Sequence, residues 1–305
     1  MKFHSYISNF KKIKIIIFFF ISFLIIDRSI SNLLFYFTNY SSLPHAELYS
    51  GNGETEIMIL GNSRGYRSFD ENLIEKKTGK KTKNYSLIGS STLINEILIN
   101  DYIEIYKNKP KIIIFEISNL LSDNAALKDL RVFGYKSKRI SNILKNDYPK
   151  LYYSGLISNL FNFNNSTFFN SMQKIFVKYE YKGLTGKINK INLQIEKKTF
   201  IENEFSNKNI SSLKRIVKLC NEKNIEIILV IAPLYYEILN NEMNEFNLWK
   251  KNIYKNIENI KIFDFSSNLK NKELFHDWKH ININGINEFH QIFFDNKNIS
   301  NLLLK

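Results

Sequence analysis

The stretch EIMILGNSRG at residues 56–65 decides the fold, because a short apolar run leads directly into a glycine-containing turn. An apolar run without polar alternation is typical of a strand that is covered on both faces, as in a parallel sheet. The turn that follows places a serine, Ser63, just beyond the carboxyl end of the strand Glu56–Leu60. Open parallel sheets bind their ligands at that edge. This one stretch therefore indicates both an architecture and a place for a functional site.

Segments of helical period alternate with four more strand-like runs along the chain. This alternation is the signature of β-α-β units, so the sequence predicts an α/β fold: a three-layer α/β/α sandwich with a mostly parallel five-stranded sheet. The expected strands are residues 56–60, 82–87, 111–117, 225–232 and 260–265. The expected helices are residues 70–77, 91–107, 211–224, 236–257 and 284–294.

The alternation fails between Ser122 and Asn209, where aromatic and asparagine-rich sequence replaces it. We interpret residues 122–209 as an insertion into the α/β domain. Insertions after sheet strands build lids and substrate surfaces, and they also serve as structural caps over a sheet. The predicted organisation is an N-terminal segment, residues 1–39, and an α/β domain, residues 40–305, that carries this insertion.

The N-terminal segment holds an apolar run from Ile15 to Ile26, preceded by Lys11, Lys12 and Lys14 and closed by Asp27 and Arg28. The length of the run is in the range of a signal-peptide core. No small-x-small cleavage site follows promptly, and long basic side chains can reach the interfaces of a thinned bilayer. We therefore expect an uncleaved single span, with the domain on the extracytoplasmic side of the inner or cytoplasmic membrane. A buried or amphipathic N-terminal helix is the alternative.

Composition narrows the classes of function. The 305 residues include 43 Lys and Arg against 29 Asp and Glu, which gives a net charge of +14. The lysines are scattered along the chain and no nucleic-acid-binding motif accompanies them, so we expect no nucleic-acid partner. The single cysteine, Cys220, excludes a disulfide scaffold and lies on the apolar face of a predicted helix.

A second polar motif, FHDWKHIN at residues 275–282, follows the last predicted strand. Asp277 and His280 are three residues apart, a spacing that lets a carboxylate accept the Nδ1–H of an imidazole. The other imidazole nitrogen is then free to accept a proton from a serine. A surface turn with an Asp–His hydrogen bond is the structural alternative, as a capping or turn serine is for Ser63.

Together, the Gly61-Asn62-Ser63 turn and the Asp-x-x-His motif resemble the first and last blocks of the SGNH/GDSL hydrolase superfamily, with Asn62 in place of the usual aspartate. The resemblance implies that Ser63 is the nucleophile, His280 the general base and Asp277 the residue that orients the imidazole. It also implies an oxyanion hole made by Ser63, Gly89 and Asn119. Gly89 matches the second block, whereas Asn119 lacks the glycine and aspartate that flank the family's third-block asparagine.

A serine nucleophile with an imidazole base performs acyl transfer, without a cofactor or a metal. An anchored domain with a large insertion is similar to the membrane-linked acyltransferases of this superfamily, such as alginate O-acetyltransferases and the teichoic acid D-alanyl transfer protein. This likeness implies O-acylation or de-O-acylation of a cell-surface glycan, with a membrane acyl-donor protein as partner. A secreted carboxylesterase or lipase, and a catalytically silent glycan-binding or assembly protein, remain as alternatives.

Overall fold

The computed structural model describes residues 3–117, 126–181, 183–188, 207–235, 237, 243–257 and 260–304. The chain forms two compact units. Unit 1 comprises Met1–Ser50 and Lys128–Lys178, and unit 2 comprises Gly51–Leu127 and Tyr179–Lys305.

Unit 2 contains a five-stranded sheet in which every pair of neighbouring strands is parallel. The spatial order is β2-β1-β3-β4-β5, with register pairs that include Ile57 with Ile112 and Leu229 with Ile262. The strands are β1 (Ile57–Leu60), β2 (Thr82–Asn84), β3 (Ile112–Glu116), β4 (Glu226–Ile231) and β5 (Ile262–Asp264). The side chains of β1 and β3 are buried throughout, as expected for strands covered on both faces.

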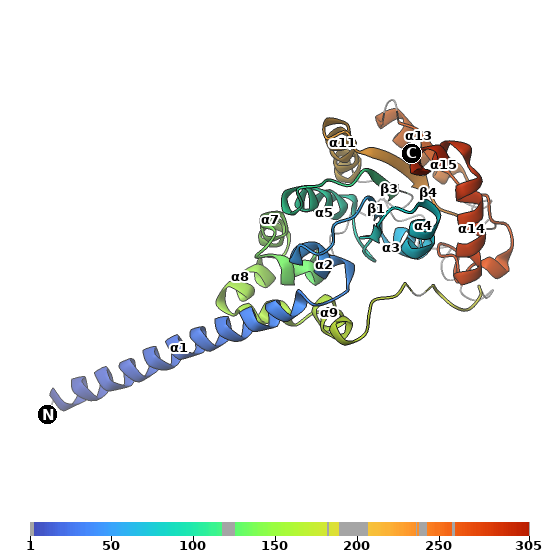
Figure 1. Cartoon of the computed structure of the whole chain (residues 1–305). Coiled ribbons are helices and arrows are strands. Elements are labelled where there is room, and N and C mark those ends of the chain that lie inside the picture. The colour runs from blue at the N-terminus through green and yellow to red at the C-terminus, as the bar shows by residue number, and fades with distance from the viewer. Residues whose placement is uncertain are drawn as a thin grey trace. The chain divides into compact units, whose positions relative to one another are not determined.

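Helices of unit 2 lie on both sides of this sheet (Figure 1). On one side α5 (Thr92–Ile105) packs against α11 (Asn207–Glu222). On the other side α14 (Ile283–Asp295) packs against α3 (Ser63–Ser68). The remaining helices of unit 2 are α4 (Glu71–Thr78), α13 (Met243–Asn256), η3 (Lys272–Leu274) and α15 (Lys297–Leu304). The structure thus confirms the predicted α/β fold and its five parallel strands.

Unit 1 is helical in its described residues. Its helices are α1 (Phe3–Thr38), α2 (Pro44–Ser50), η1 (Arg131–Phe133), α7 (Lys138–Asp147), α8 (Pro149–Ile157), η2 (Asn159–Phe163) and α9 (Ser166–Phe176). The short α6 (Leu127–Leu130) begins at the boundary between the units. Aromatic packing holds unit 1 together, because Phe35 of α1 meets Tyr135 edge-on at 4.2 Å and Tyr49 stacks on Phe133 at 4.7 Å.

Asp27 fastens α1 to the rest of unit 1. Its carboxylate accepts hydrogen bonds from the Ser158 hydroxyl at 2.5 Å and from the backbone N–H groups of Asn159 and Leu160 at 2.7 and 3.2 Å. Although burial alone raises the pKa of Asp27, these hydrogen bonds and the charge of Arg28 lower it overall. A charged residue that follows the apolar run is therefore an internal anchor of unit 1.

The predicted membrane span is wrong. Among the described residues, no helix combines the length and the uncharged apolar content needed to cross a bilayer. The physical reason lies in α1, where the run from Ile15 to Ile26 is bounded by Lys14 and Asp27. At ~1.5 Å per residue this run covers only about 18 Å of helix, whereas a hydrocarbon core is about 30 Å thick. The predicted single span, and with it the predicted location, is withdrawn.

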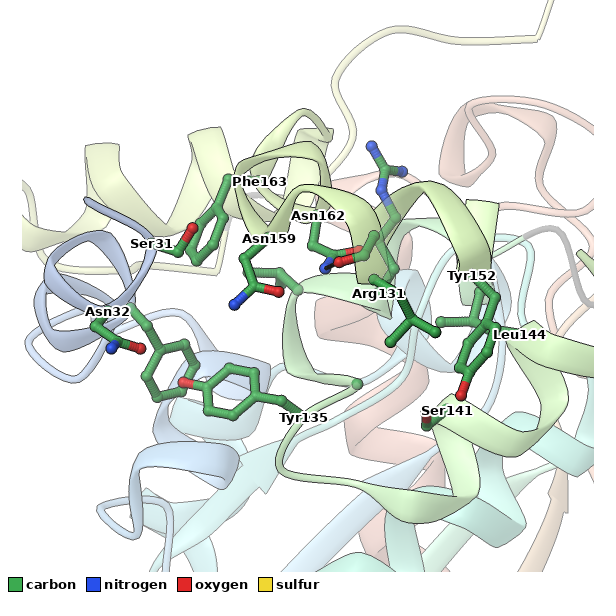
Figure 2. Close-up of a pocket in the computed structure, with 15 residues that line it drawn as sticks. Ser31, Asn32, Arg131, Tyr135, Ser141, Leu144, Tyr152, Asn159, Asn162 and Phe163 are labelled. Carbon is green, nitrogen blue, oxygen red and sulfur yellow. Dashed lines mark hydrogen bonds between the residues drawn. The ribbon is translucent and has the colours of Figure 1, made fainter. Parts of the chain in front are cut away.

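A pocket of about 230 Å³ lies within unit 1 (Figure 2). Its wall mixes aromatic rings with amide and hydroxyl groups, among them those of Tyr135, Tyr152, Asn159 and Asn162. Gly155 lies beside it, where a Cβ atom would come within 2.3 Å of the Asn162 Oδ1. None of the residues that line the pocket is an aspartate, a glutamate or a histidine. The pocket thus offers shape and amide groups but no general base.

Candidate active site

The turn after β1 presents Ser63 as the first residue of α3. Asn62 is the N-cap of this helix, since its side-chain Oδ1 accepts the backbone N–H of Arg64 at 2.8 Å. Gly61 is required by close packing, because a Cβ atom there would come within 3.0 Å of both the Glu116 Cβ and the Gly65 Cα. Asn62 therefore serves the turn as a helix cap.

His280 and Asp277 lie on the loop between β5 and α14, which returns across the carboxyl edge of the sheet. The backbone N–H of Tyr235, just beyond β4, donates to the carbonyl of Trp278 in this loop at 3.0 Å. Within the loop the Asp277 carboxylate accepts the backbone N–H groups of Lys279 and His280, each at 2.9 Å. The carboxylate is thus fixed by its own turn before it meets the imidazole.

The structure brings Ser63, His280 and Asp277 together. The Nε2 of His280 lies 2.9 Å from the Oγ of Ser63, and the Nδ1 lies 2.7 Å from an oxygen of Asp277. Because an ionised carboxylate only accepts hydrogen bonds, the Nδ1 carries the proton and the Nε2 accepts the serine hydroxyl. This is the arrangement in which an imidazole can act as general base toward a serine.

Partial burial strengthens the contact between the two charged or chargeable groups. The side chains of His280 and Asp277 are 14% and 21% exposed. Burial by itself raises the pKa of Asp277, but the hydrogen bond and charge of His280 and two backbone N–H groups lower it overall. Asp277 is therefore an anion near neutral pH, able to stabilise an imidazolium during a proton transfer.

The backbone amides of Ser63 and Gly89 lie on two turns that are hydrogen-bonded to each other. The turn that carries Gly89 is bonded to the turn that carries Ser63, because the Leu87 N–H and the Ser90 hydroxyl both donate to the carbonyl of Gly61, at 3.2 and 2.9 Å. Within the described residues, neither the Ser63 N–H nor the Gly89 N–H donates to another protein group. These amides suit the predicted oxyanion hole, which remains a prediction. Asn119, its third predicted member, lies outside the described residues.

A segment within the predicted insertion forms one side of the site. Residues 179–188, of which all but 182 are described, contact α3. The Tyr181 hydroxyl donates to the backbone carbonyl of Arg67 at 2.8 Å, and the Tyr179 hydroxyl donates to the hydroxyl of Tyr66 at 3.3 Å. We call these residues the strap. Burial raises the pKa of both Tyr179 and Tyr181, so both hydroxyls stay protonated as donors.

The strap also contacts the loop that carries His280. The carbonyl of Thr185 lies 2.5 Å from the Nδ1 of His276, and the N–H of Ile283 donates to the carbonyl of Leu184 at 2.9 Å. The Asn282 amide donates to the carbonyl of Gly186 at 3.1 Å. The strap therefore bonds both to α3, which begins at Ser63, and to the loop that carries Asp277 and His280. No local pattern could have predicted the bonds to this loop, because the carbonyls of Leu184, Thr185 and Gly186 belong to the backbone and carry no side-chain signal.

In the described part of the chain, no group of three or more His, Cys, Asp or Glu side chains is placed so that it could bind a metal ion. The buried Cys220 belongs to the core of α11, as predicted, and burial raises the pKa of its thiol to about 12. Among the described residues of unit 2, Ser63, His280 and Asp277 thus form a hydrogen-bonded set that contains a hydroxyl, an imidazole and a carboxylate.

Comparison with known proteins gives little further information. No family model matches the chain, and no curated protein matches it. Among solved structures, one similar chain is from Streptococcus pneumonia and is described as a "putative platelet activating factor". The two chains share 12% sequence identity, the match covers 94% of this chain and 99% of that one, and the TM-score is 0.40. At that level of similarity the match carries no argument about function.

Proposed function

We propose that this protein is a serine-dependent acyl-transfer enzyme whose triad is Ser63, His280 and Asp277. The observation that carries the proposal is the continuous pair of hydrogen bonds from the Ser63 hydroxyl through the His280 imidazole to the Asp277 carboxylate. The parallel sheet supports it, since both segments follow carboxyl ends of strands, where such sheets bind ligands. The resemblance of the two motifs to the SGNH/GDSL superfamily also supports it.

The first half of the reaction forms an acyl-enzyme. The Oγ of Ser63 attacks the carbonyl carbon of an ester while the Nε2 of His280 takes the hydroxyl proton. The Asp277 carboxylate stabilises the resulting imidazolium, and the amides of Ser63 and Gly89 stabilise the negative oxygen of the tetrahedral intermediate. The intermediate then releases the alcohol, which receives its proton from His280, and leaves the acyl group on Ser63.

The second half removes the acyl group. Water or the hydroxyl of an acceptor attacks the ester carbonyl on Ser63, and His280 takes the proton of the attacking group. Collapse of the second intermediate returns that proton to the Ser63 oxygen and regenerates the free serine. With water the product is a free acid, and with a sugar hydroxyl it is an O-acylated glycan. We propose a glycan ester as the substrate class, with an acyl-donor protein as possible partner, on the basis of the family resemblance alone.

Turnover of 4-nitrophenyl acetate by the full chain tests the proposed activity. We expect the release of 4-nitrophenol to be lost in Ser63→Ala and in His280→Ala, because triad members act as a unit. Ser166→Ala is the matched control, since Ser166 is an exposed serine at the first position of α9. Turnover that survives in Ser63→Ala, or folded wild-type protein without turnover, would contradict the proposal. Added monosaccharides that capture the acetyl group would distinguish a transferase from an esterase.

A plain carboxylesterase uses the same residues and differs in its acceptor, so the capture experiment decides between the two. A catalytically silent protein was suggested by the replacement of the family's aspartate with Asn62. The side-chain oxygen of Asn62 accepts a hydrogen bond from the backbone N–H of Arg64 and so caps α3. The replacement of the aspartate is therefore weaker support for a silent protein, because the asparagine stabilises the turn. Loss of turnover in Ser63→Ala would dismiss the silent alternative directly.

A further inference from the structure

The pocket within unit 1 is a cavity that the proposed function does not use. Its volume is about 230 Å³, and its wall is formed by residues of α1, η1, α7, α8 and η2. Sites for drug-sized ligands have volumes of about 300–1,000 Å³, so this pocket suits a single small ring. No member of the proposed triad lines it.

Several polar side chains in the wall have no partner in the described part of the protein. Neither the side-chain amide of Asn159 nor the hydroxyls of Ser141 and Tyr152 bond to another protein group there. The Nδ2 of Asn162 makes only a long hydrogen bond, of 3.4 Å, to the carbonyl of Gly155. Figure 2 shows these side chains in the wall. A pocket in which a few polar groups converge among apolar ones is typical of a ligand site.

The two asparagines of the wall are held in place by other parts of unit 1. The backbone N–H of Asn159 donates to the buried carboxylate of Asp27 at 2.7 Å. Asn162 lies against Gly155, where a Cβ atom would come within 2.3 Å of the Asn162 Oδ1. The glycine therefore leaves room for the amide. Because a preformed site loses less conformational entropy on binding, this arrangement favours a small ligand.

The unpartnered groups are neutral, and each can both donate and accept a hydrogen bond. A side-chain amide has an acceptor oxygen and two donor hydrogens, and a hydroxyl has one donor hydrogen and two lone pairs. A carboxylate only accepts and an ammonium group only donates, so either would leave half of this capacity unused. The hydroxyls of a sugar donate and accept, and a polyhydroxylated ring therefore matches the amides and hydroxyls of the wall.

The charge of the wall also disfavours a cationic ligand. Among the described residues that line the pocket, Arg131 is the one charged side chain. Both terminal nitrogens of its guanidinium donate to backbone carbonyls, those of Lys128 and Asn164. These nitrogens are therefore occupied by the chain itself, while the positive charge repels a cation.

Two aromatic rings supply an apolar surface for the same ligand. Phe35 and Tyr135 both line the pocket, and they meet edge-on with their ring centroids 4.2 Å apart. The face of an aromatic ring carries a partial negative charge, which attracts C–H groups. The C–H face of a saturated sugar ring can therefore pack on these rings while its hydroxyls meet the amides.

We propose that the pocket of unit 1 binds one neutral sugar ring. The hydroxyls of the sugar pair with Asn159, Asn162 and Tyr152, and its C–H face packs on the ring of Tyr135. No imidazole or carboxylate lines the pocket, so the site binds its ligand without reacting with it. This binding does not depend on the proposed function of Ser63.

NMR titration of the full chain with methyl β-D-glucopyranoside and with methyl β-D-galactopyranoside tests the proposal. Ser63→Ala protein is used, so that a failure of the proposed function does not affect the result. With at least one glycoside, the side-chain amide signal of Asn159, assigned by its loss in Asn159→Leu, should shift and saturate. Cyclohexanol, a saturated ring with a single hydroxyl, should bind at least about tenfold more weakly. A signal that neither glycoside shifts at about 50 mM, or cyclohexanol that binds as tightly, would overturn the proposal.

Two substitutions in the wall, each with a matched control, test where the glycoside binds. Followed through the side-chain amide of Asn162, the Kd should rise about threefold to tenfold in Tyr152→Phe and about tenfold in Asn159→Leu. Tyr153→Phe on α8 and Asn142→Leu on α7 change exposed residues outside the wall, and they should leave the Kd unchanged. A Kd that neither wall variant raises would overturn the proposal. If Asn159→Leu does not fold, Tyr152→Phe against Tyr153→Phe decides the question.

Discussion

The dipeptide Asn-Ser begins a helix in each of the two units. Among the described residues, only one of the two serine hydroxyls is hydrogen-bonded to an imidazole. Asn62 caps α3 through the N–H of Arg64 in unit 2, and Asn165 caps α9 through the N–H of Phe168 in unit 1. Ser63 lies 2.9 Å from the Nε2 of His280. Ser166 has no hydrogen bond from its hydroxyl in the described part of the chain.

The comparison shows that a serine after an asparagine N-cap is a local structure that both units form. A serine nucleophile also requires a general base, which must come from another part of the chain. His280 is 217 residues away from Ser63 along the chain. In unit 1 the pocket supplies shape, amides and rings, yet no imidazole or carboxylate lines it. If the proposed function is correct, substitutions at the Ser63 site of unit 2 should lower turnover, whereas substitutions in unit 1 should lower stability and leave turnover unchanged.

Asp277→Asn should have the largest effect among them. An amide in place of the carboxylate removes the negative charge and lets the imidazole adopt the wrong tautomer, so kcat for 4-nitrophenyl acetate should fall by about 10³- to 10⁴-fold. The fold should survive, because an asparagine oxygen still accepts the N–H groups of Lys279 and His280. Stopped-flow and steady-state kinetics, with circular dichroism as a check of folding, measure the effect. Activity within threefold of wild type would break the proposed triad.

His290 is a second histidine near α3, and it tests the distinction between the proposed general base, His280, and a histidine buried in the core. Its Nε2 accepts the backbone N–H of Asp70 at 3.2 Å among aromatic rings, and burial lowers its pKa from 6.5 to about 4. The unfolded chain takes up a proton near pH 6.5 and the folded chain only near pH 4, so this contribution to stability is complete above pH 6.5 and is lost as the pH falls to 4. The loss should reach about 3 kcal/mol.

Urea unfolding at several pH values between 7.5 and 4.5 measures this effect. His290→Gln, which does not titrate, is the control, and its stability should vary less with pH over the same range. Equal pH dependence in wild type and His290→Gln would contradict the assignment of His290 as a neutral core residue.

Gly155→Ala tests whether the pocket of unit 1 is structural. The added Cβ atom would meet the Asn162 side chain at 2.3 Å, so the contact between α8 and η2 must shift. We expect a loss of about 1–3 kcal/mol in the free energy of unfolding, measured by urea denaturation, with kcat/KM unchanged. Ser154→Ala, one residue earlier on α8, is the matched control. A fall in kcat/KM at full stability would place unit 1 in the catalytic machinery.

Tyr181→Phe should have the smallest effect. It removes the hydroxyl that bonds to the carbonyl of Arg67 and keeps the ring of the strap in place. Loss of one partly buried hydrogen bond at the edge of the site should lower kcat/KM by about threefold to tenfold. Tyr153→Phe in unit 1, where the tyrosine is exposed, is the control. Identical kinetics in wild type and Tyr181→Phe would show that the strap does not position α3 through this contact.

The part of the fold that was predictable consists of short-range patterns. Apolar β-branched runs predicted all five strands of the sheet, and the helical period predicted α5 and α11 on one of its sides. The two motifs indicated Ser63, Asp277 and His280 because parallel strands end at one edge of the sheet. Their hydrogen bonds could be expected from this topology, although no local pattern contains them.

Long-range contacts explain what could not be predicted. In the sequence, Asp27 directly follows an apolar run, yet its partners lie 131–133 residues further along the chain at Ser158, Asn159 and Leu160. Without those contacts, an apolar run next to a charge is indistinguishable from a short membrane anchor. Arg64 and Glu116 are each 2% exposed, and the Nε of Arg64 lies 3.9 Å from an oxygen of Glu116. This buried ion pair could not be predicted either, since nothing in the sequence distinguishes a buried charge from an exposed one.

The central claim is that Ser63 accepts an acyl group, and intact-mass analysis of the full chain quenched during reaction with 4-nitrophenyl acetate tests it most directly. The account predicts a single acetyl adduct on the peptide that contains Ser63. That adduct should be present in wild type and in Ser166→Ala and absent from Ser63→Ala. Folded wild-type protein that gives neither an adduct nor released 4-nitrophenol, or an adduct that persists in Ser63→Ala, would contradict the account.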